Sequence, residues 1–299
     1  RANKDGGAAM AEPNVVMGSR MIGDITLGDL RVPRLGFGAM RITGEDIWGD
    51  PPDPAAARRL LQRVVELGVR FIDTADAYGP DVSERLIAEA LHPYPAGLVI
   101  GTKGGIVRPD RATWSPDGRP AHLREACEGS LRRLRLERID LYQLHAVDPR
   151  VPLEDSVGEL ARLQGEGKIR HVGLSNVSVD ELERARRLVK VVSVQNRYNV
   201  ADRSSKDVLA VCERDGLAFI PWSPLVQGER DRGSPQRAAL ESWARKRDLS
   251  LHQAALAWLL NKSPVMLPIP GTSKVPHLES NLAAALAARG LRRDLSAVS

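Results

Sequence analysis

The chain contains 299 residues, of which 42% are hydrophobic and 27% charged, a balance that excludes a wholly disordered protein. It has no run of about 18 consecutive apolar residues, and its only cysteines are Cys127 and Cys212. The sequence therefore excludes a membrane-spanning helix, a disulfide scaffold and a cysteine-rich zinc site. The net charge is +5, but the arginines are dispersed among acidic residues and leucines, which argues against a nucleic-acid partner.

The first residues are small and polar, and they lack the apolar centre of a signal peptide. We expect a flexible tail over 1–23, of which the part before Met10 is compatible with an expression remnant. With so few cysteines, a cytoplasmic location is expected. Alternation at Ile25, Leu27 and Leu30 predicts a short hairpin. A single domain is expected over 24–290, followed by a tail over 291–299.

From there, short apolar runs alternate with amphipathic patterns, which is typical of βαβ units and a parallel sheet. The expected strands are 34–40, 69–73, 98–102, 139–144, 169–174, 191–195, 217–220 and 265–269. The expected helices are 54–67, 82–91, 122–136, 153–165, 179–189, 203–215, 235–260 (interpreted as two helices) and 276–289. Start signals are Asp53 before Pro54, Ser178 and Ser250, and stop signals are Gly68, Gly167 and Gly216.

Eight strands alternating with eight helical regions predict an α/β protein, a single-domain (β/α)8 TIM barrel with a short hairpin before it. The competing architecture is an open doubly wound sheet, which usually carries a Gly-x-Gly-x-x-Gly turn after its first strand. Gly36 and Gly38 are followed by Ala39–Ile42 and do not complete that turn, and no phosphate loop occurs. The barrel is therefore the preferred fold.

Chemistry in such a barrel lies at the carboxyl ends of the strands, where polar or aromatic residues follow almost every apolar run. These residues are Asp73, Lys103, His145, Ser175, Asn176, Gln195, Trp222 and Ser223, with Tyr78 in the loop after the second strand. A buried lysine and aspartate would pair, and the lysine would lower the pKa of a neighbouring tyrosine. A histidine beside them can hydrogen-bond a carbonyl oxygen. Each residue alone has an ordinary structural explanation, but their joint placement favours a reaction site.

Several segments resemble the aldo-keto reductases, in the right order and over about residues 24–289. They are Phe71–Gly79, Gly101–Gly104, Asp140–His145, Gly173–Asn176, Gln195–Asn199 and Ile269–Ser273. This resemblance implies an oxidoreductase that reduces an aldehyde or ketone with NADPH, with NADH less favoured. It implies Tyr78 as general acid, Lys103 and Asp73 as groups that tune it, and His145 as the residue that positions the carbonyl.

The same resemblance implies the cofactor contacts. Ser175, Asn176 and Gln195 would hold the carboxamide, Trp222 would stack on the nicotinamide, and Ser223 and Leu225 would line the pyrophosphate. The phosphate end would be formed by Gly271, Thr272, Ser273, Lys274, His277 and Asn281, and Gly38, Met40 and Asp73 complete the set. A cation at Lys274 beside two hydroxyls suits a 2′-phosphate. Many relatives carry arginine near position 277, so the strength of the preference for NADPH stays open.

A finer likeness, in segments such as Arg34–Met40 and Leu91–Tyr94, is to the pyridoxal reductase (pyridoxine 4-dehydrogenase)-like branch, which suggests pyridoxal-like aldehydes as substrates. Trp48 and Trp114, with Tyr78 and His145, are the expected pocket walls. The sequence leaves two alternative functions to compare with this one. One is a non-catalytic NADPH-binding barrel subunit or interaction protein. The other is a metal hydrolase, which the scattered histidines disfavour, so no metal is expected. The choice between monomer and homo-oligomer stays open.

Overall fold

The computed structural model describes residues 22–225 and 233–288. Apart from residues 22–23, the tails expected at 1–23 and 291–299 lie outside these ranges, and so does the expected domain boundary at 290. Within the described part, the parallel strands form one sheet, in the spatial order β11-β10-β9-β8-β5-β4-β3. Their bounds are β3 (Phe37–Gly38), β4 (Phe71–Asp73), β5 (Val99–Gly104), β8 (Ile139–Leu144), β9 (Ile169–Ser175), β10 (Val191–Gln195) and β11 (Ala218–Phe219).

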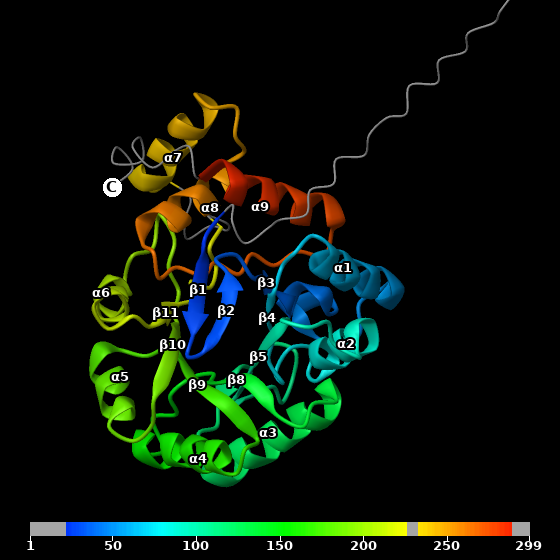
Figure 1. The fold of residues 1–299 in the computed structure, drawn as a ribbon, viewed down its shortest axis with the longest axis vertical. Coiled ribbons are helices and arrows are strands. Elements are labelled where there is room, and N and C mark those ends of the chain that lie inside the picture. The colour runs from blue at the N-terminus through cyan, green and yellow to red at the C-terminus, as the bar shows by residue number, and fades with distance from the viewer. Residues whose placement is uncertain (1–21, 226–232, 289–299) are drawn as a thin grey trace, which may run out of the picture.

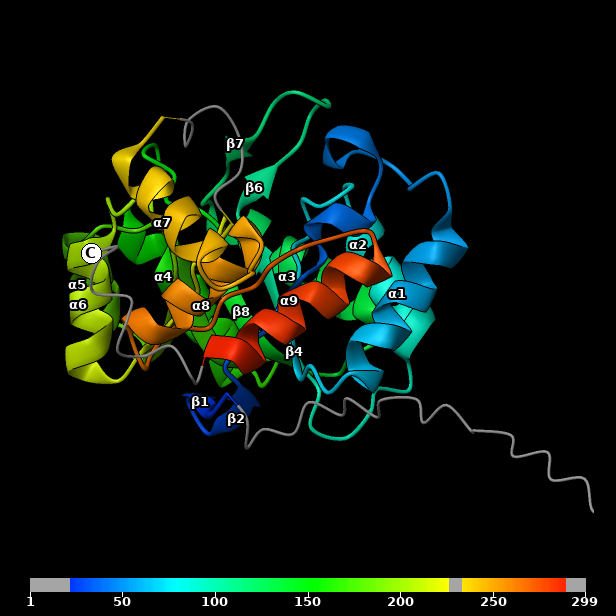
Figure 2. The same ribbon diagram turned by 90° about the horizontal axis from the view of Figure 1, so that it is seen from above.

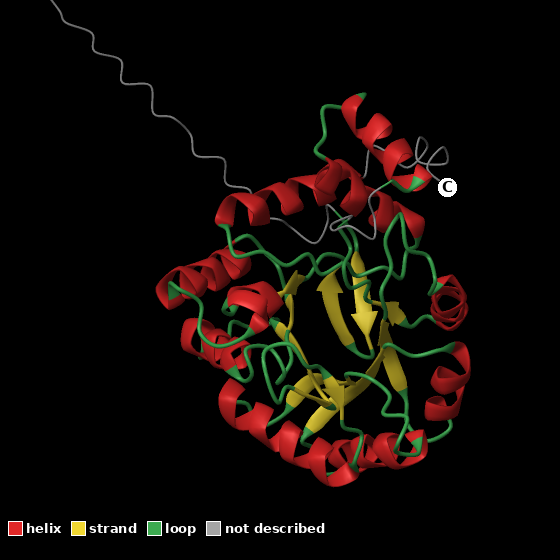
Figure 3. Cartoon of the chain, turned by 180° about the vertical axis from the view of Figure 1, so that it is seen from behind, coloured by secondary structure: helices red, strands yellow, loops and turns green. Residues whose placement is uncertain are grey.

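The sheet curls into a ring that helices surround on the outside (Figures 1 and 3), which confirms the predicted (β/α)8 barrel. The helices are α1 (Pro54–Glu66), α2 (Val82–Leu91), α3 (Pro120–Leu134), α4 (Leu153–Gly165), α5 (Val179–Arg186), α6 (Lys206–Asp215), α7 (Pro235–Arg245), α8 (Leu251–Lys262) and α9 (Val275–Ala287). The expected start signals hold. Asp53 Oδ1 accepts from the Ala56 amide at 2.8 Å, and Ser178 and Ser250 each form a capping box.

The ring closes through the segment 265–269, which differs from the predicted eighth strand. Only Met266 forms a regular bridge, with Phe219. The Leu267 amide donates to Phe219 O at 2.9 Å, and the Gly36 amide donates to Pro268 O at 2.9 Å, so the segment lies between β11 and β3. Prolines at 268 and 270 remove the amides that a continuous ladder needs, and this explains why no regular strand forms here.

We call the junction between β3 and residues 268–271 the closing seam. The backbones approach so closely there that a Cβ on Gly38 would lie 2.7 Å from Ile269 O. A Cβ on Gly271 would lie 2.7 Å from Gly38 O. Both positions therefore require glycine, because either side chain would push the two segments apart.

Two hairpins lie at opposite ends of the barrel (Figure 2). The predicted N-terminal hairpin, β1 (Asp24–Leu27) and β2 (Leu30–Pro33), is confirmed and covers one end. Its turn residue Asp29 accepts from Arg170 at 2.6 Å and contacts the His171 ring at 2.5 Å. The second hairpin, β6 (Ile106–Val107) and β7 (Ser115–Pro116), was not predicted from the sequence. It stands at the end of the barrel where the strands have their carboxyl termini.

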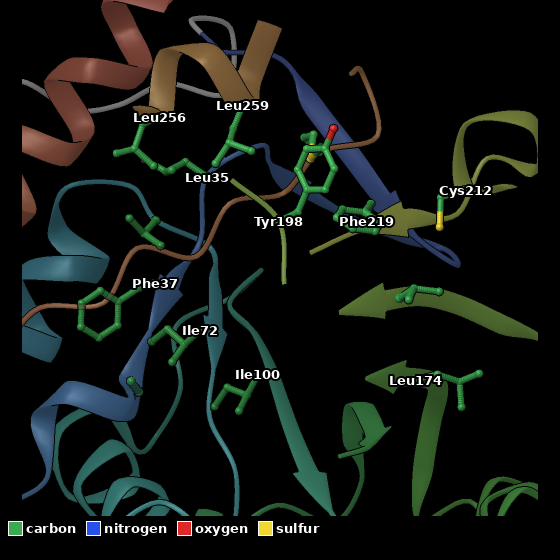
Figure 4. Packing of buried hydrophobic residues seen from close by; sticks show 14 of the residues in the cluster. Leu35, Phe37, Ile72, Ile100, Leu174, Tyr198, Cys212, Phe219, Leu256 and Leu259 are labelled. Atoms are coloured by element: carbon green, nitrogen blue, oxygen red, sulfur yellow. The ribbon is translucent and has the colours of Figure 1, made fainter. Parts of the chain in front are cut away.

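Two apolar clusters show which way the strand residues face. The larger cluster packs the outer face of the strands against the helices and contains Ile72 and Ile100 (Figure 4). The smaller one fills the barrel interior with Phe71, Val99 and Leu141, and the N-terminal hairpin packs against it. Since successive side chains in a strand point to opposite faces, the residues two and four positions further along point inward as well.

Candidate active site

This alternation brings polar side chains to one end of the barrel interior. Asp73 follows Phe71 by two residues on β4, and Lys103 follows Val99 by four on β5. His145 follows Leu141 by four at the end of β8. The three strands are direct neighbours in the sheet, as the sequence predicted. The packed side chains of Phe71, Val99 and Leu141 thus fix the positions of the polar residues that follow them on the same strands.

Lys103 is the central group of this cluster. It is fully buried, and its Nζ donates to Asp73 Oδ2 at 2.7 Å, to the Thr74 carbonyl at 2.8 Å and to Tyr78 Oη at 3.2 Å. An ammonium has three protons, so these contacts satisfy all of its donors. The tyrosine hydroxyl is therefore held at a fixed distance from a buried positive charge.

Asp73 is held from its other side by two amides. Its Oδ1 accepts from Gln195 Nε2 at 2.8 Å and from Gln143 Nε2 at 3.1 Å. Gln195 was expected to contact a cofactor; in this structure its amide nitrogen binds Asp73. Gln143 was missed by the sequence analysis. Its position two residues after Leu141, on the same inward face, was the available signal.

The electrostatics keep these groups in definite protonation states. Burial alone would lower the pKa of Lys103, but Asp73 and Tyr78 together raise it, so Lys103 stays charged. Burial raises the pKa of Tyr78 and outweighs the opposing charge of Lys103. This corrects the sequence-based expectation of a net lowering by the lysine. Burial, assisted by Lys103, lowers the pKa of His145 well below its ordinary value, so its ring is neutral.

A cavity of about 420 Å³ opens above this cluster. Its lining includes most of the predicted site residues, namely Gly38, Met40, Asp73, Tyr78, Trp114, His145, Ser175, Asn176, Gln195, Trp222, Ser223, Leu225 and Gly271. Arg41, Pro224, Ile269 and Pro270 also line it and were not predicted. The rings of Tyr78 and His145 meet edge to face, with centroids 5.8 Å apart.

Trp222 is oriented by a chain of hydrogen bonds along the wall of this cavity. Its Nε1 donates to Asn176 Oδ1 at 3.0 Å, and Asn176 Nδ2 donates to the His145 carbonyl at 3.0 Å. Asn176 has a φ of 58°, a left-handed conformation that asparagine tolerates better than most residues. The indole ring is therefore fixed relative to the strand that carries His145.

A second cavity, of about 470 Å³, adjoins the first and shares Met40, Arg41 and Gly271 with it. The predicted phosphate-end residues Thr272, Ser273, Lys274 and His277 line this second cavity. The first cavity contributes aromatic walls, and the second contributes cations and hydroxyls. That donor set fits a dinucleotide carrying an anionic phosphate group.

Two predicted site residues lie elsewhere. Asn281 is buried on α9, outside the lining of both cavities. Trp48 also lines neither cavity; it bridges to Gly79, and its ring centroid lies 5.4 Å from the guanidinium of Arg108. Trp48 thus supports the residues behind the pocket wall rather than forming the wall. Among the described residues there is no cluster of three metal-ligating side chains, and no helix there is long and apolar enough to cross a membrane.

Comparisons with known proteins agree with this geometry. The model of the Aldo/keto reductase family matches residues 34–289. An uncharacterized oxidoreductase of Schizosaccharomyces pombe is 51% identical over 88% of this chain and 85% of its own. Pyridoxine 4-dehydrogenase of Escherichia coli is 40% identical over 87% and 91%. An aldo/keto reductase of Klebsiella pneumoniae, solved with NADP and acetate, has 27% identity, covers 88% and 89%, and superposes with a TM-score of 0.70.

Proposed function

The chain belongs to the aldo/keto reductase family and is an NADP-dependent oxidoreductase, and from this premise we propose that it reduces an aldehyde or ketone with Tyr78 as the proton donor. The observation that carries the proposal is the 3.2 Å contact between Tyr78 Oη and the buried Lys103 Nζ, on the wall of a cavity that His145 also lines. The likeness to pyridoxine 4-dehydrogenase supports pyridoxal-like aldehydes as substrates. The cytoplasmic location stays a prediction.

The two adjoining cavities would hold the cofactor. When bound, NADPH supplies the hydride that reduces the carbonyl carbon. The nicotinamide end fits the first cavity, where Ser175 and Asn176 present polar groups beside the fixed indole of Trp222. The phosphate end fits the second cavity, where Lys274 provides a cation beside the hydroxyl of Ser273. Gly38, Met40, Gln195, Ser223, Leu225, Gly271, Thr272 and His277 complete the proposed set in these cavities, and Asn281, which lines neither, stays a prediction from the resemblance.

Tyr78 would deliver its proton to the carbonyl oxygen as negative charge develops there. Burial keeps the hydroxyl protonated at rest, because it raises the pKa of Tyr78. As the proton leaves, the phenolate forms next to the charged Lys103, which stabilises it. Asp73 in turn keeps Lys103 charged in a site that excludes water, since an unpaired ammonium there would be costly.

His145 would orient the carbonyl. Its neutral ring has one N–H donor, which can bind the same oxygen that receives the proton from Tyr78. Its Nδ1 atom is buried and has no hydrogen-bond partner among the described residues. Because that atom is buried, the ring would present its other nitrogen, Nε2, to a carbonyl in the cavity that His145 lines, and two donors converging on one oxygen favour the transition state over the ground state.

The test is the oxidation of NADPH, followed at 340 nm, with a panel of aldehydes that includes pyridoxal. We expect turnover of at least one aldehyde, and a fall of about 10²–10⁴ in Tyr78→Phe, the range typical of a lost general acid. Affinity for NADPH should change little, because phenylalanine keeps the ring and its packing. Near-normal turnover by Tyr78→Phe would refute the role of this residue. No turnover across the panel, with NADPH still bound, would favour the non-catalytic subunit.

A further inference from the structure

Arg108 is a nearly buried cation in the β6–β7 hairpin whose hydrogen bonds go to carbonyl groups. The residue is 7% exposed. Its Nη1 donates to Ile47 O at 3.1 Å, and its Nη2 donates to Asp46 O at 3.3 Å and to Arg111 O at 2.5 Å. The first two carbonyls belong to the loop after β3. One side chain therefore joins two loops that stand at the mouth of the barrel.

The loop that Arg108 binds has an unusual backbone. Asp46 and Ile47 have φ values of 56° and 60°, in the left-handed region that residues with a Cβ rarely adopt. A β-branched residue such as Ile47 is especially unfavourable there. Such a conformation persists only where surrounding contacts enforce it, and two donors from one guanidinium supply such contacts.

This loop is also tied to the segment that carries the proposed proton donor. The Gly49 amide donates to Gly79 O at 2.6 Å, and the Gly79 amide donates to Ile47 O at 3.2 Å. Gly79 directly follows Tyr78 in the chain. The Ile47 carbonyl thus accepts from both Arg108 and Gly79, and it connects the hairpin to the backbone next to Tyr78.

The guanidinium also lies against the aromatic wall of the cavity. Its carbon is 3.8 Å from the centroid of the Trp114 ring and 5.4 Å from that of Trp48. Trp114 is 38% exposed, lines the first cavity, and meets Tyr78 edge to face at a centroid distance of 6.3 Å. Of these two ring contacts of Trp114, the one to Arg108 is the shorter, and a cation over the face of an indole restricts where the ring stands.

We propose that Arg108 is a positioning residue that holds the Trp114 ring beside Tyr78 and thereby makes the site selective for aldehydes carried on a flat aromatic ring. The inference rests on the proposed function, since it concerns the substrate of the same site. Arg108 itself is not in the lining of the cavity. A fixed indole offers an aromatic ring a geometry-dependent contact beyond simple burial, whereas a saturated ring of similar size gains the burial alone.

The test compares benzaldehyde with cyclohexanecarbaldehyde, which have six-membered rings of similar size and differ in flatness. The quantity measured is the ratio of their kcat/KM values. We expect the wild-type ratio to favour benzaldehyde, and Arg108→Gln to lower the ratio about two- to tenfold, the worth of one aromatic contact. The loss should appear mainly in the KM for benzaldehyde, with the Kd for NADPH unchanged. Arg111→Gln, the same change at an exposed arginine of this hairpin, should leave the ratio as it is.

A second variant, Trp114→Ala, tests the same inference at an exposed residue, whereas Arg108→Gln changes a buried one. It should lower the ratio as much as Arg108→Gln does, and adding Arg108→Gln to it should change the ratio no further. A preference that persists in Trp114→Ala, or an equal loss for both aldehydes in Arg108→Gln, would overturn the inference and leave the proposed function intact. A wild-type protein that binds NADPH and reduces neither aldehyde, nor any other in the panel, would overturn both.

Discussion

Replacing Lys103 with methionine tests how the buried charges contribute to stability and to chemistry. Methionine keeps an unbranched side chain but removes the ammonium. In the wild type, Lys103 and Asp73 are 0% and 2% exposed and form a 2.7 Å ion pair. In the variant, the Asp73 carboxylate stays buried and keeps only the amide donors of Gln143 and Gln195. The negative charge is then uncompensated.

Removing one partner of a buried ion pair costs about 3–5 kcal/mol, and solvent screening reduces this little at such low exposure. For a protein of this size, 1 kcal/mol corresponds to about 2–4 °C in Tm, so Lys103→Met should melt about 6–20 °C below the wild type. The double variant Lys103→Met with Asp73→Asn removes both charges, and asparagine still offers an oxygen to the two glutamines. Its Tm should recover most of the loss.

Measuring turnover separates the effect of the lost charge on stability from its effect on chemistry. Both variants lack the cation beside Tyr78, so both should reduce aldehydes about 10²-fold or more slowly, whatever their stability. Thermal unfolding followed by circular dichroism, together with NADPH oxidation at a temperature where all variants are folded, measures both quantities. A Tm of Lys103→Met within about 2 °C of the wild type would refute the uncompensated charge. A double variant as unstable as the single one would attribute the loss to packing instead.

Lys274→Ala should weaken NADPH binding about tenfold, the low end for an exposed charged hydrogen bond, and leave NADH binding unchanged in fluorescence titrations. An equal loss for both cofactors would indicate a structural role. Burial raises the pKa of the Cys127 and Cys212 thiols to about 12, so Ellman's reagent at pH 8 should label neither in the folded protein and both in guanidinium. Rapid labelling of the native protein would contradict this. The chemical rate should be flat between about pH 6 and pH 8, because the pKa of His145 lies well below 6.5 and that of Tyr78 above 10.0. An inflection near pH 6.5 would assign a charged state to His145.

Where local chemistry dominates, the sequence predicted the structure closely. Helices α2 and α4 begin and end at the predicted residues, although neither has a side-chain cap at its N-terminus, because apolar periodicity is visible within a few positions of the chain. The inward direction of Asp73 and Lys103 follows from the two-residue period of a strand. The family resemblance added the roles of these residues, which no periodicity contains.

Contacts between distant segments were harder to predict. The β6–β7 hairpin has strands of two residues, too short to show a period, and Arg108 finds its partners about 60 residues earlier in the chain. The segment 265–269 reads as a strand by its apolar content, but its position is held by few hydrogen bonds. The net rise in the pKa of Tyr78 reflects how deeply the ring is buried, a quantity that only the assembled barrel defines.

The closing seam couples binding of the cofactor to the stability of the folded protein. The barrel is joined there by few hydrogen bonds, and proposed cofactor contacts lie on both of its sides, Met40 after β3 and Gly271 across from it. A ligand held by both sides resists their separation, and at 100 times its Kd it adds about 2.7 kcal/mol to folding. Amide exchange at Gly36 should therefore slow when NADPH is present. Proteolysis that proceeds through this opening should likewise slow when the cofactor is bound.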